Sequence, residues 1–320
     1  GPIILTRFVK NPFGFDGEAS FDFEHFEQVV KTQVRFLDNV LDLTYWPLPE
    51  QRKEADDKRR IGVGFTGLGD TLIMLKLGYN QAEGRAMAQK IAASMRDAAY
   101  RASVDLARAK GRFPLFDAEK YLNAPGFASR LSEDIKKDIR KHGIRNSHLL
   151  SVAPTGTVSL AFADNASNGI EPPFSWTYKR KKREKDGSTR EYAVEDHAWR
   201  MYRDLGGDVN ALPPYFVTAL EMTAQEHLAM MQAVQPYIDT AISKTVNVPA
   251  EYPYDDFKNL YFQAWKANLK GLATYRPNSI LGAVLEVNTE SASKETTAKK
   301  EILPLSRKVI EKRPNGELPA

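Results

Sequence analysis

The hydrophobic pattern of the chain alternates between short apolar runs and longer stretches with helical spacing. Five short runs, rich in β-branched and other apolar residues, predict strands at residues 3–9, 61–66, 149–153, 243–248 and 272–275. Helical segments separate each run from the next, and this alternation predicts an α/β domain with a largely parallel sheet. Five strands are too few for the usual eight-stranded barrel, so we expect an open sheet or half of a larger barrel.

The stretches between these strands carry apolar residues at every third or fourth position. This spacing predicts helices over residues 23–43, 82–110, 131–142 and 254–269. Thr223 and Glu226 have the spacing of a capping box and predict the start of another helix. The polar stretch 179–190, with Asp186-Gly187 near its middle, predicts a hairpin.

Composition narrows the classes of protein that remain. The 320 residues include 45 basic and 41 acidic side chains, a net charge of +4, and much of the excess lies at 179–185. A balance this mild favours a solvated hairpin there over a nucleic-acid site. No apolar run is long enough to span a bilayer and no signal peptide opens the chain, so we expect a cytoplasmic protein without nucleic-acid or membrane partners.

The chain contains no cysteine. Disulfides, thiolate metal sites and thiol catalysis are therefore excluded within this polypeptide. The sequence begins Gly1-Pro2 and ends at Ala320 without a helix stop, from which we expect a fragment of a longer chain. Residues 288–300, rich in Ser, Thr, Lys and Glu, are expected to form a flexible linker.

The segment 151–159 is the most informative local candidate for chemistry. A predicted buried strand ends there in a glycine-containing turn that carries hydroxyls at Thr155, Thr157 and Ser159. The turn can start a helix with Thr157 as its cap, and free amides at a helix start suit a phosphate. Strand-to-helix turns of this composition are also common structural elements, so spacing alone leaves both interpretations open.

A second candidate segment spans 165–173. Asn168-Gly169 predicts a turn, and Pro172-Pro173 stiffens the chain after it. Glu171 is either a buried functional carboxylate or a solvated loop acid. The five histidines lack metal-site spacing. Gly62, Gly64 and Gly67 match a dinucleotide pattern, but glycines that pack a strand closely against its neighbours are the favoured interpretation.

Nine segments, taken in order, resemble the cobalamin-dependent class II ribonucleotide reductases. The resemblance runs from about residue 3 to 285 and departs from the family at Ile4, where the family has Asn. The segments are Ile3-Ile-Leu-Thr-Arg-Phe-Val9, Leu37-Asp-Asn-Val-Leu-Asp42, Pro47-Leu-Pro-Glu-Gln51, Lys58-Arg-Arg-Ile-Gly-Val-Gly-Phe-Thr-Gly-Leu-Gly-Asp70, His142-Gly-Ile-Arg-Asn146, Ala153-Pro-Thr-Gly-Thr157, Asn168-Gly-Ile-Glu-Pro-Pro173, Ser243-Lys-Thr-Val-Asn-Val248 and Gly271-Leu-Ala-Thr-Tyr-Arg-Pro-Asn278.

The resemblance implies a fold and a substrate site. Residues 1–285 would be the second five-stranded half of a ten-stranded α/β barrel, and 286–320 a linker and the start of a truncated C-terminal region. The substrate phosphates would bind the family's phosphate loop. Its residues here are Ala153, Pro154, Thr155, Gly156, Thr157, Val158 and Ser159. The substrate-adjacent residues are Asn168, Gly169, Glu171 and Pro172.

The resemblance also implies a mechanism that this chain cannot complete alone. In the family, adenosylcobalamin generates a cysteine thiyl radical that attacks the ribonucleotide, and further cysteines supply electrons. An Asn-x-Cys-x-Glu loop carries the radical cysteine, and this chain has none. We therefore expect the N-terminal half of the reductase and an external thiol reductant as partners. The alternatives are a non-catalytic nucleotide-binding or regulatory protein derived from the reductase, and an unrelated phosphate-binding α/β protein.

Overall fold

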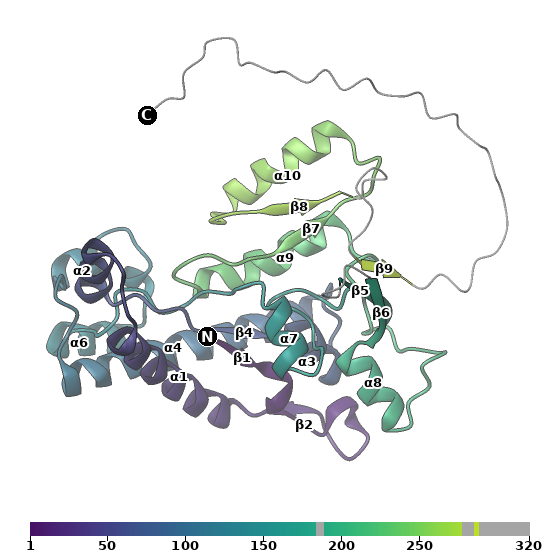
Figure 1. Ribbon diagram of the computed structural model, residues 1–320, viewed down its shortest axis with the longest axis horizontal. Coiled ribbons are helices and arrows are strands. Elements are labelled where there is room, and N and C mark those ends of the chain that lie inside the picture. Colours follow the sequence, from purple (N-terminus) through teal and green to yellow (C-terminus); the bar gives the residue numbers. More distant parts are fainter. Residues whose placement is uncertain (184–188, 277–284, 288–320) are drawn as a thin grey trace, which may run out of the picture. The chain divides into compact units, whose positions relative to one another are not determined.

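The computed structural model describes residues 1–183, 189–276 and 285–287 (Figure 1). The helices are α1 (Phe23–Leu43), α2 (Pro49–Lys58), α3 (Leu68–Met74), α4 (Ala82–Lys110), α5 (Ala118–Asn123), α6 (Glu133–His142), α7 (Gly156–Phe162), α8 (His197–Asp204), α9 (Ala224–Val234) and α10 (Tyr254–Lys266). The strands are β1 (Pro2–Ile4), β2 (Val9–Lys10), β3 (Ser20–Phe21), β4 (Gly64–Thr66), β5 (Thr177–Arg183), β6 (Thr189–Glu195), β7 (Thr245–Asn247), β8 (Ala273–Tyr275) and β9 (Leu285–Val287). Short 3₁₀ turns are η1 (Leu5–Phe8), η2 (Pro12–Gly14), η3 (Ala128–Arg130) and η4 (Gln235–Tyr237).

The parallel strands and bridges lie side by side in the order in which they occur along the chain. β1 pairs with β4 and β7 pairs with β8, both in parallel. Single parallel bridges connect Val63 to Leu150 and Val152 to Ile242, so the segment around residues 149–152 lies between β4 and the chain that leads into β7. A mixed α/β fold is confirmed, although the strands within the described residues do not close into a barrel.

The strand predicted at residues 3–9 is wrong over most of its length. Within this range only Ile3 and Ile4 of β1 and Val9 of β2 lie in strands, and between them the chain turns through η1. Leu5 and Phe8 are both buried. An extended chain would place two residues three positions apart on opposite faces, whereas a 3₁₀ turn places them on the same face. The turn therefore buries both side chains in one core.

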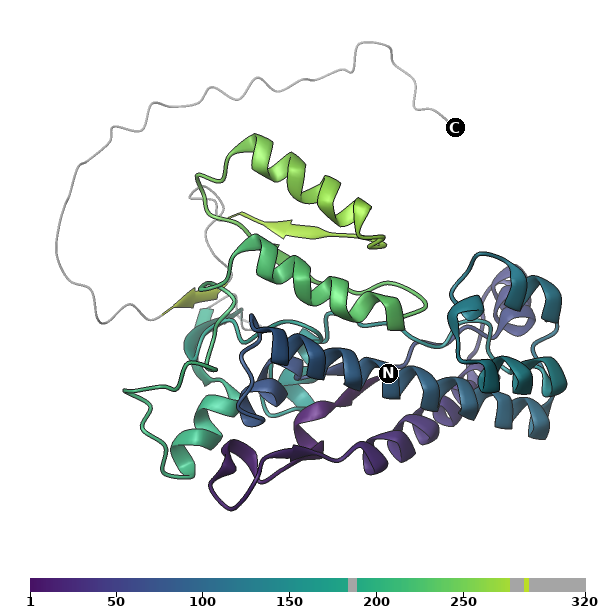
Figure 2. The same cartoon turned by 180° about the vertical axis from the view of Figure 1, so that it is seen from behind.

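The helices predicted from periodicity are present, with small shifts at their ends. α1 packs along α4, and these two long helices lie side by side in both views (Figure 2). Phe26 and Val30 of α1 and Ile91 and Met95 of α4 are fully buried in the main core. The capping box at the start of α9 is confirmed, because Thr223 and Glu226 each accept the other's backbone amide.

The predicted hairpin is confirmed as an antiparallel pair of β5 and β6, in which Arg183 lies opposite Thr189. β9 adds a third strand against β5. The expected turn at Asp186-Gly187 and the expected linker at 288–300 lie outside the described residues.

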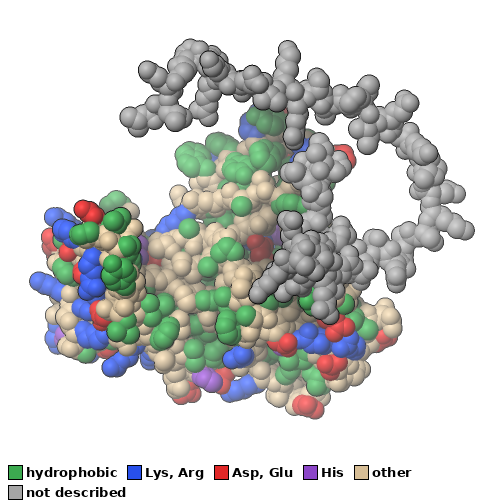
Figure 3. All heavy atoms as spheres, viewed as in Figure 1, with side chains coloured by type: hydrophobic (Ala, Val, Ile, Leu, Met, Phe, Trp, Pro, Cys, Tyr) green, Lys and Arg blue, Asp and Glu red, His purple; other side chains and the backbone are tan. Residues whose placement is uncertain are grey.

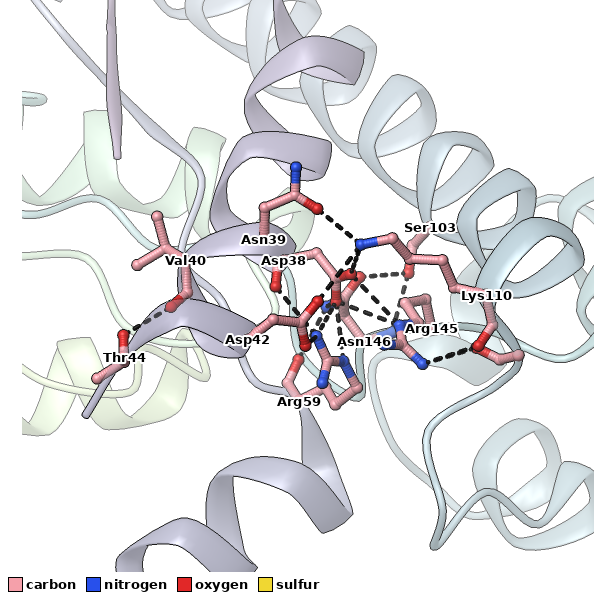
Figure 4. Close-up of polar contacts among 11 residues, drawn as sticks. Asp38, Asn39, Val40, Asp42, Thr44, Arg59, Ser103, Lys110, Arg145 and Asn146 are labelled. Carbon is pink, nitrogen blue, oxygen red and sulfur yellow. Dashed lines mark hydrogen bonds and ion pairs between the residues drawn. The ribbon is translucent and has the colours of Figure 1, made fainter. Parts of the chain in front are cut away.

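A buried ion network closes the end of the core where α1 and α4 meet (Figure 4). Asp38 is completely buried, and its Oδ1 accepts a hydrogen bond of 2.9 Å from Arg59 Nε. Arg145 Nε and Lys110 Nζ each lie 3.3 Å from Asp38 Oδ2. Asn146 Nδ2 donates to Asp38 Oδ1 at 3.1 Å. Three of the segments that carry the family resemblance thus meet at one carboxylate.

Candidate functional site

A pocket of about 730 Å³ lies beside the parallel strands β7 and β8. Most of the pocket wall comes from the loop 165–175, which includes the second candidate segment. The remaining lining residues are Tyr178, Asp196, Ala219, Thr245, Asn247, Thr274, Tyr275 and Arg276.

Asp70, in the first turn of α3, holds this wall in place. Its Oδ2 accepts a 2.6 Å hydrogen bond from the Ser167 amide, and its Oδ1 accepts one of 2.8 Å from the Ala198 amide. Asp196 lies beside it at the pocket. Burial, together with the negative charge of Asp70, raises the pKa of Asp196 well above its ordinary value.

The glycine-rich segment before α3 allows close packing, as predicted. A Cβ atom at Gly64 would lie 2.0 Å from the Ser151 carbonyl oxygen, and one at Gly62 would lie 2.4 Å from Ser151 Oγ. Gly69 lies against the candidate segment 165–173, because a Cβ added at Gly69 would lie 2.8 Å from Pro172 Cα. These glycines bring β4 and α3 against the two candidate segments, and this accounts for the dinucleotide-like pattern.

The turn at 153–159 forms the start of α7. The expected cap was Thr157, but the N-cap position is occupied by Thr155, whose φ of +54° turns the chain into the helix. The Thr155 side chain makes no hydrogen bond that caps α7. Instead its Oγ1 accepts a 2.8 Å hydrogen bond from the Gly169 amide.

Two of the three candidate hydroxyls in this turn are engaged inside the protein. Thr66 Oγ1 lies 2.8 Å from Thr155 Oγ1 and 3.1 Å from Ser159 Oγ. Thr66 Oγ1 also lies 3.1 Å from the Ser167 carbonyl oxygen. The Thr157 side chain remains exposed, and the first amides of α7 lack acceptors within the helix.

The structure brings the two candidate segments together. A Cβ at Gly169, where φ is +53°, would lie 2.6 Å from the Ala153 carbonyl oxygen. A Cβ at Gly156 would meet only Asn168 Nδ2, at 3.7 Å. Asn168 also lines the pocket, whereas residues 153–159 do not. Ala153 and Pro154 are exposed and Val158 is half-buried beside this contact.

Glu171 is neither an isolated buried acid nor a freely solvated one. Its side chain is 22% exposed, and Oε2 accepts a 2.7 Å hydrogen bond from Lys244 Nζ. Oε1 accepts one of 2.6 Å from the Thr245 amide. Pro172 is buried next to it. Sequence reasoning missed Lys244, because no short spacing connects it with residue 171.

His227 of α9 completes this group. Its Nε2 lies 3.1 Å from the Ala219 carbonyl oxygen and therefore carries the proton, which leaves Nδ1 to accept from Lys244 at 3.0 Å. Burial and the nearby Lys244 ammonium lower the pKa of His227 to about 3. The imidazole is thus neutral at physiological pH.

The part of the chain that the structure describes contains no cluster of three His, Asp or Glu side chains that could hold a metal ion. None of its helices has the length and apolar character required to cross a membrane.

The fold and the pocket define an α/β domain with a candidate ligand site beside parallel strands. Residues 1–275 match the family described as ribonucleotide reductase, barrel domain, and the chain belongs to this family. It is 34% identical over 304 residues to a vitamin B12-dependent ribonucleoside-diphosphate reductase of Mycobacterium tuberculosis strain H37Rv, covering 89% of this chain and 39% of that protein.

Two other relatives agree with this assignment. A vitamin B12-dependent ribonucleoside-diphosphate reductase of Thermoplasma acidophilum is 29% identical over 98% of this chain and 39% of its own length. The ribonucleoside-diphosphate reductase subunit alpha of Treponema pallidum is 27% identical over 81% of this chain and 29% of its own length. The chain spans about two fifths of the length of the first relatives that it matches.

Proposed function

We propose that this chain is the second five-stranded half of the ten-stranded catalytic barrel of an adenosylcobalamin-dependent ribonucleotide reductase. The complete enzyme would convert ribonucleotides to deoxyribonucleotides by radical chemistry. The observation that carries the proposal is the contact between the segments 153–159 and 165–173 beside a pocket of about 730 Å³, a volume that suits a nucleotide. The printed names of the relatives in Mycobacterium and Thermoplasma support the cobalamin-dependent class.

The proposed substrate site uses both segments. The phosphates would lie at residues 153–159, bound by the first backbone amides of α7 and by the Thr157 hydroxyl. The hydroxyls of Thr155 and Ser159 would position the turn, because both contact Thr66. The nucleoside would lie in the pocket beside Asn168 and Glu171.

The described pocket does not fit a cobalamin, which is several times larger than a nucleotide. Adenosylcobalamin supplies radical initiation in the proposed complete enzyme, and its binding would depend on parts of the enzyme other than this pocket. The role of this chain is then to bind and orient the substrate. The radical cysteine, the reducing cysteines and the Asn-x-Cys-x-Glu loop would come from the N-terminal half of the reductase and its C-terminal region.

A second candidate function is that of a non-catalytic nucleotide-binding or regulatory protein derived from the reductase. The observation that favours it is the absence of cysteine from all 320 residues. A thiyl mechanism needs a thiol, so neither candidate function allows this chain to react alone. The two candidates differ in whether a partner polypeptide restores activity.

The distinguishing experiment measures deoxycytidine diphosphate formed from cytidine diphosphate. We predict no product from the purified chain with adenosylcobalamin and dithiothreitol, because no thiyl radical can form on it. Adding the polypeptide of the same organism that carries the Asn-x-Cys-x-Glu loop should produce deoxynucleotide. Product from the chain alone would contradict the proposed mechanism, and no product from the mixture would favour the binding protein.

A further inference from the structure

The Lys244 ammonium lies in a buried site with a full set of acceptors. Lys244 is 2% exposed, and its three protons meet Glu171 Oε2 at 2.7 Å, His227 Nδ1 at 3.0 Å and the Thr245 carbonyl oxygen at 3.4 Å. The Tyr79 ring covers it, with the centroid 5.6 Å from Nζ. The Tyr79 hydroxyl donates to the Ile170 carbonyl oxygen at 2.5 Å, next to Glu171.

This site sets the charge that the pocket presents to a ligand. Glu171 faces the pocket, while Lys244 lies behind it and is absent from the pocket wall. The Lys244 ammonium and the Glu171 carboxylate carry opposite charges, so the pair as a whole has no net charge. Arg276, the one cationic side chain that lines the pocket among the described residues, adds a positive charge. Without Lys244, Glu171 would present an uncompensated carboxylate, which repels a phosphate-bearing ligand.

We propose that Lys244 is a positioning residue that determines specificity for anionic nucleotides by neutralising Glu171 from behind. This inference rests on the proposed function of the pocket. Lys244 also fixes the direction of Glu171, whose second oxygen receives the Thr245 amide at 2.6 Å. The pair thus joins the loop 165–175 to the start of β7 while leaving the pocket open to a phosphate-bearing ligand.

A purely structural role for Lys244 predicts a different result. If the lysine only supported the pocket wall, its loss would weaken binding of a nucleoside and of its diphosphate by the same factor. A charge role changes the ratio of the two affinities, because only the diphosphate responds to the charge of the pair. The ratio therefore separates the two roles even where both affinities fall.

The test is a cycle of charge variants measured with cytidine and cytidine diphosphate. The pair carries no charge in the wild type, −1 in Lys244→Met, +1 in Glu171→Gln and none in the double variant. We expect the diphosphate-to-nucleoside affinity ratio to fall roughly fivefold in Lys244→Met and to rise by a similar factor in Glu171→Gln. The double variant should return to within about twofold of the wild-type ratio, and high salt should reduce the differences.

A matched control removes an exposed lysine on α10. Lys258 pairs with Asp255 at 3.0 Å outside the pocket, so Lys258→Met should leave the ratio unchanged. Affinities are measured by calorimetry, and amide NMR shifts of residues 165–175 report the location of binding. Glu171→Gln keeps the lysine in place and decides the question even if Lys244→Met fails to fold.

Each outcome bears on the inference. A ratio that stays constant through the cycle, while the wild type binds, overturns the role of Lys244 and leaves the proposed function intact. A wild type that binds neither ligand in the pocket overturns the proposed function and the inference together. Opposite changes of the affinity ratio in Lys244→Met and Glu171→Gln support both the proposed function and the role of Lys244.

Discussion

At the scale of single residues, Asp38 provides the clearest link between sequence and stability. It lies in α1, is completely buried, and contacts the cations Arg59, Lys110 and Arg145. Arg59 is itself nearly buried and adopts a positive φ of +46° as it ends α2. Loss of the Asp38 charge would leave the buried guanidinium with the partly exposed Asp42 as its carboxylate partner.

We predict that Asp38→Asn lowers the free energy of unfolding by roughly 3 kcal/mol, because removing one partner of a buried ion pair is costly. Urea denaturation measures this change. Asp105→Asn is the control, since Asp105 is exposed on α4 and its pair with Arg108 is long, at 3.4 Å. The control should change stability by less than about 0.5 kcal/mol. Equal effects from the two variants would show that the network does not stabilise the fold.

His227 leads to a prediction about pH. Its pKa is about 3 in the folded chain because of burial and Lys244, against an ordinary value of 6.5. The unfolded chain therefore binds the proton more readily, and stability falls as pH decreases from 6.5 towards 3. The slope due to this residue is at most about 1.4 kcal/mol per pH unit.

We expect His227→Gln to be less stable than the wild type at pH 7.5 but to lose less stability between pH 6.5 and 4.5. Urea denaturation at several pH values measures both slopes. An unchanged acid slope in the variant would mean that His227 does not contribute to acid sensitivity.

At the scale of elements, the spacing of apolar residues predicted the helices that bury one face. The long helices α1 and α4 have clear apolar stripes, and their predicted ranges, 23–43 and 82–110, match the observed bounds. α2 was not predicted, because none of its residues is buried and it therefore has no apolar stripe. Pro49 at its first turn and the ion pairs Arg52–Asp56 and Lys58–Glu54 favour the helix instead. Figure 3 shows basic and acidic side chains together at this end of the molecule.

The candidate site was predictable in part. The composition of residues 153–159 and 165–173 identified both segments, but not the inward direction of the Thr155 and Ser159 hydroxyls. That direction depends on Thr66, which is 89 positions before Thr155. Similarly, the hydrogen bond between Lys244 and Glu171 joins residues that are 73 positions apart in the sequence. Pairings over such separations are determined by the tertiary fold and leave no local pattern in the sequence.

At the scale of the whole molecule, the parallel strands run side by side in chain order and end at two edges. In the described residues, β1 has β4 as its paired strand and β8 has β7. α10, the helix that connects the last parallel pair, exposes the side chains of Tyr254, Phe262 and Trp265. Figure 3 shows hydrophobic side chains over this helix. Two edges and an apolar surface are consistent with the proposed half-barrel.

The central claim is that a ribonucleotide binds with its phosphates at residues 153–159 and its nucleoside in the pocket. Gly156 offers a direct test, because the fold leaves room for a side chain there and a bound phosphate would not. Gly156→Val should therefore fold normally and lose phosphate binding. Gly126→Val is the matched control, since a Cβ at Gly126 would meet only the Ala124 carbonyl oxygen, at 3.9 Å.

The measurement is a titration with cytidine diphosphate followed by backbone amide NMR shifts. The wild type and Gly126→Val should show shifts in residues 153–159 and 165–175, and Gly156→Val should lose those in 153–159. Thr157→Ala should bind several-fold more weakly, because it removes one hydroxyl donor. Shifts in the wild type that avoid residues 153–159 would contradict the account.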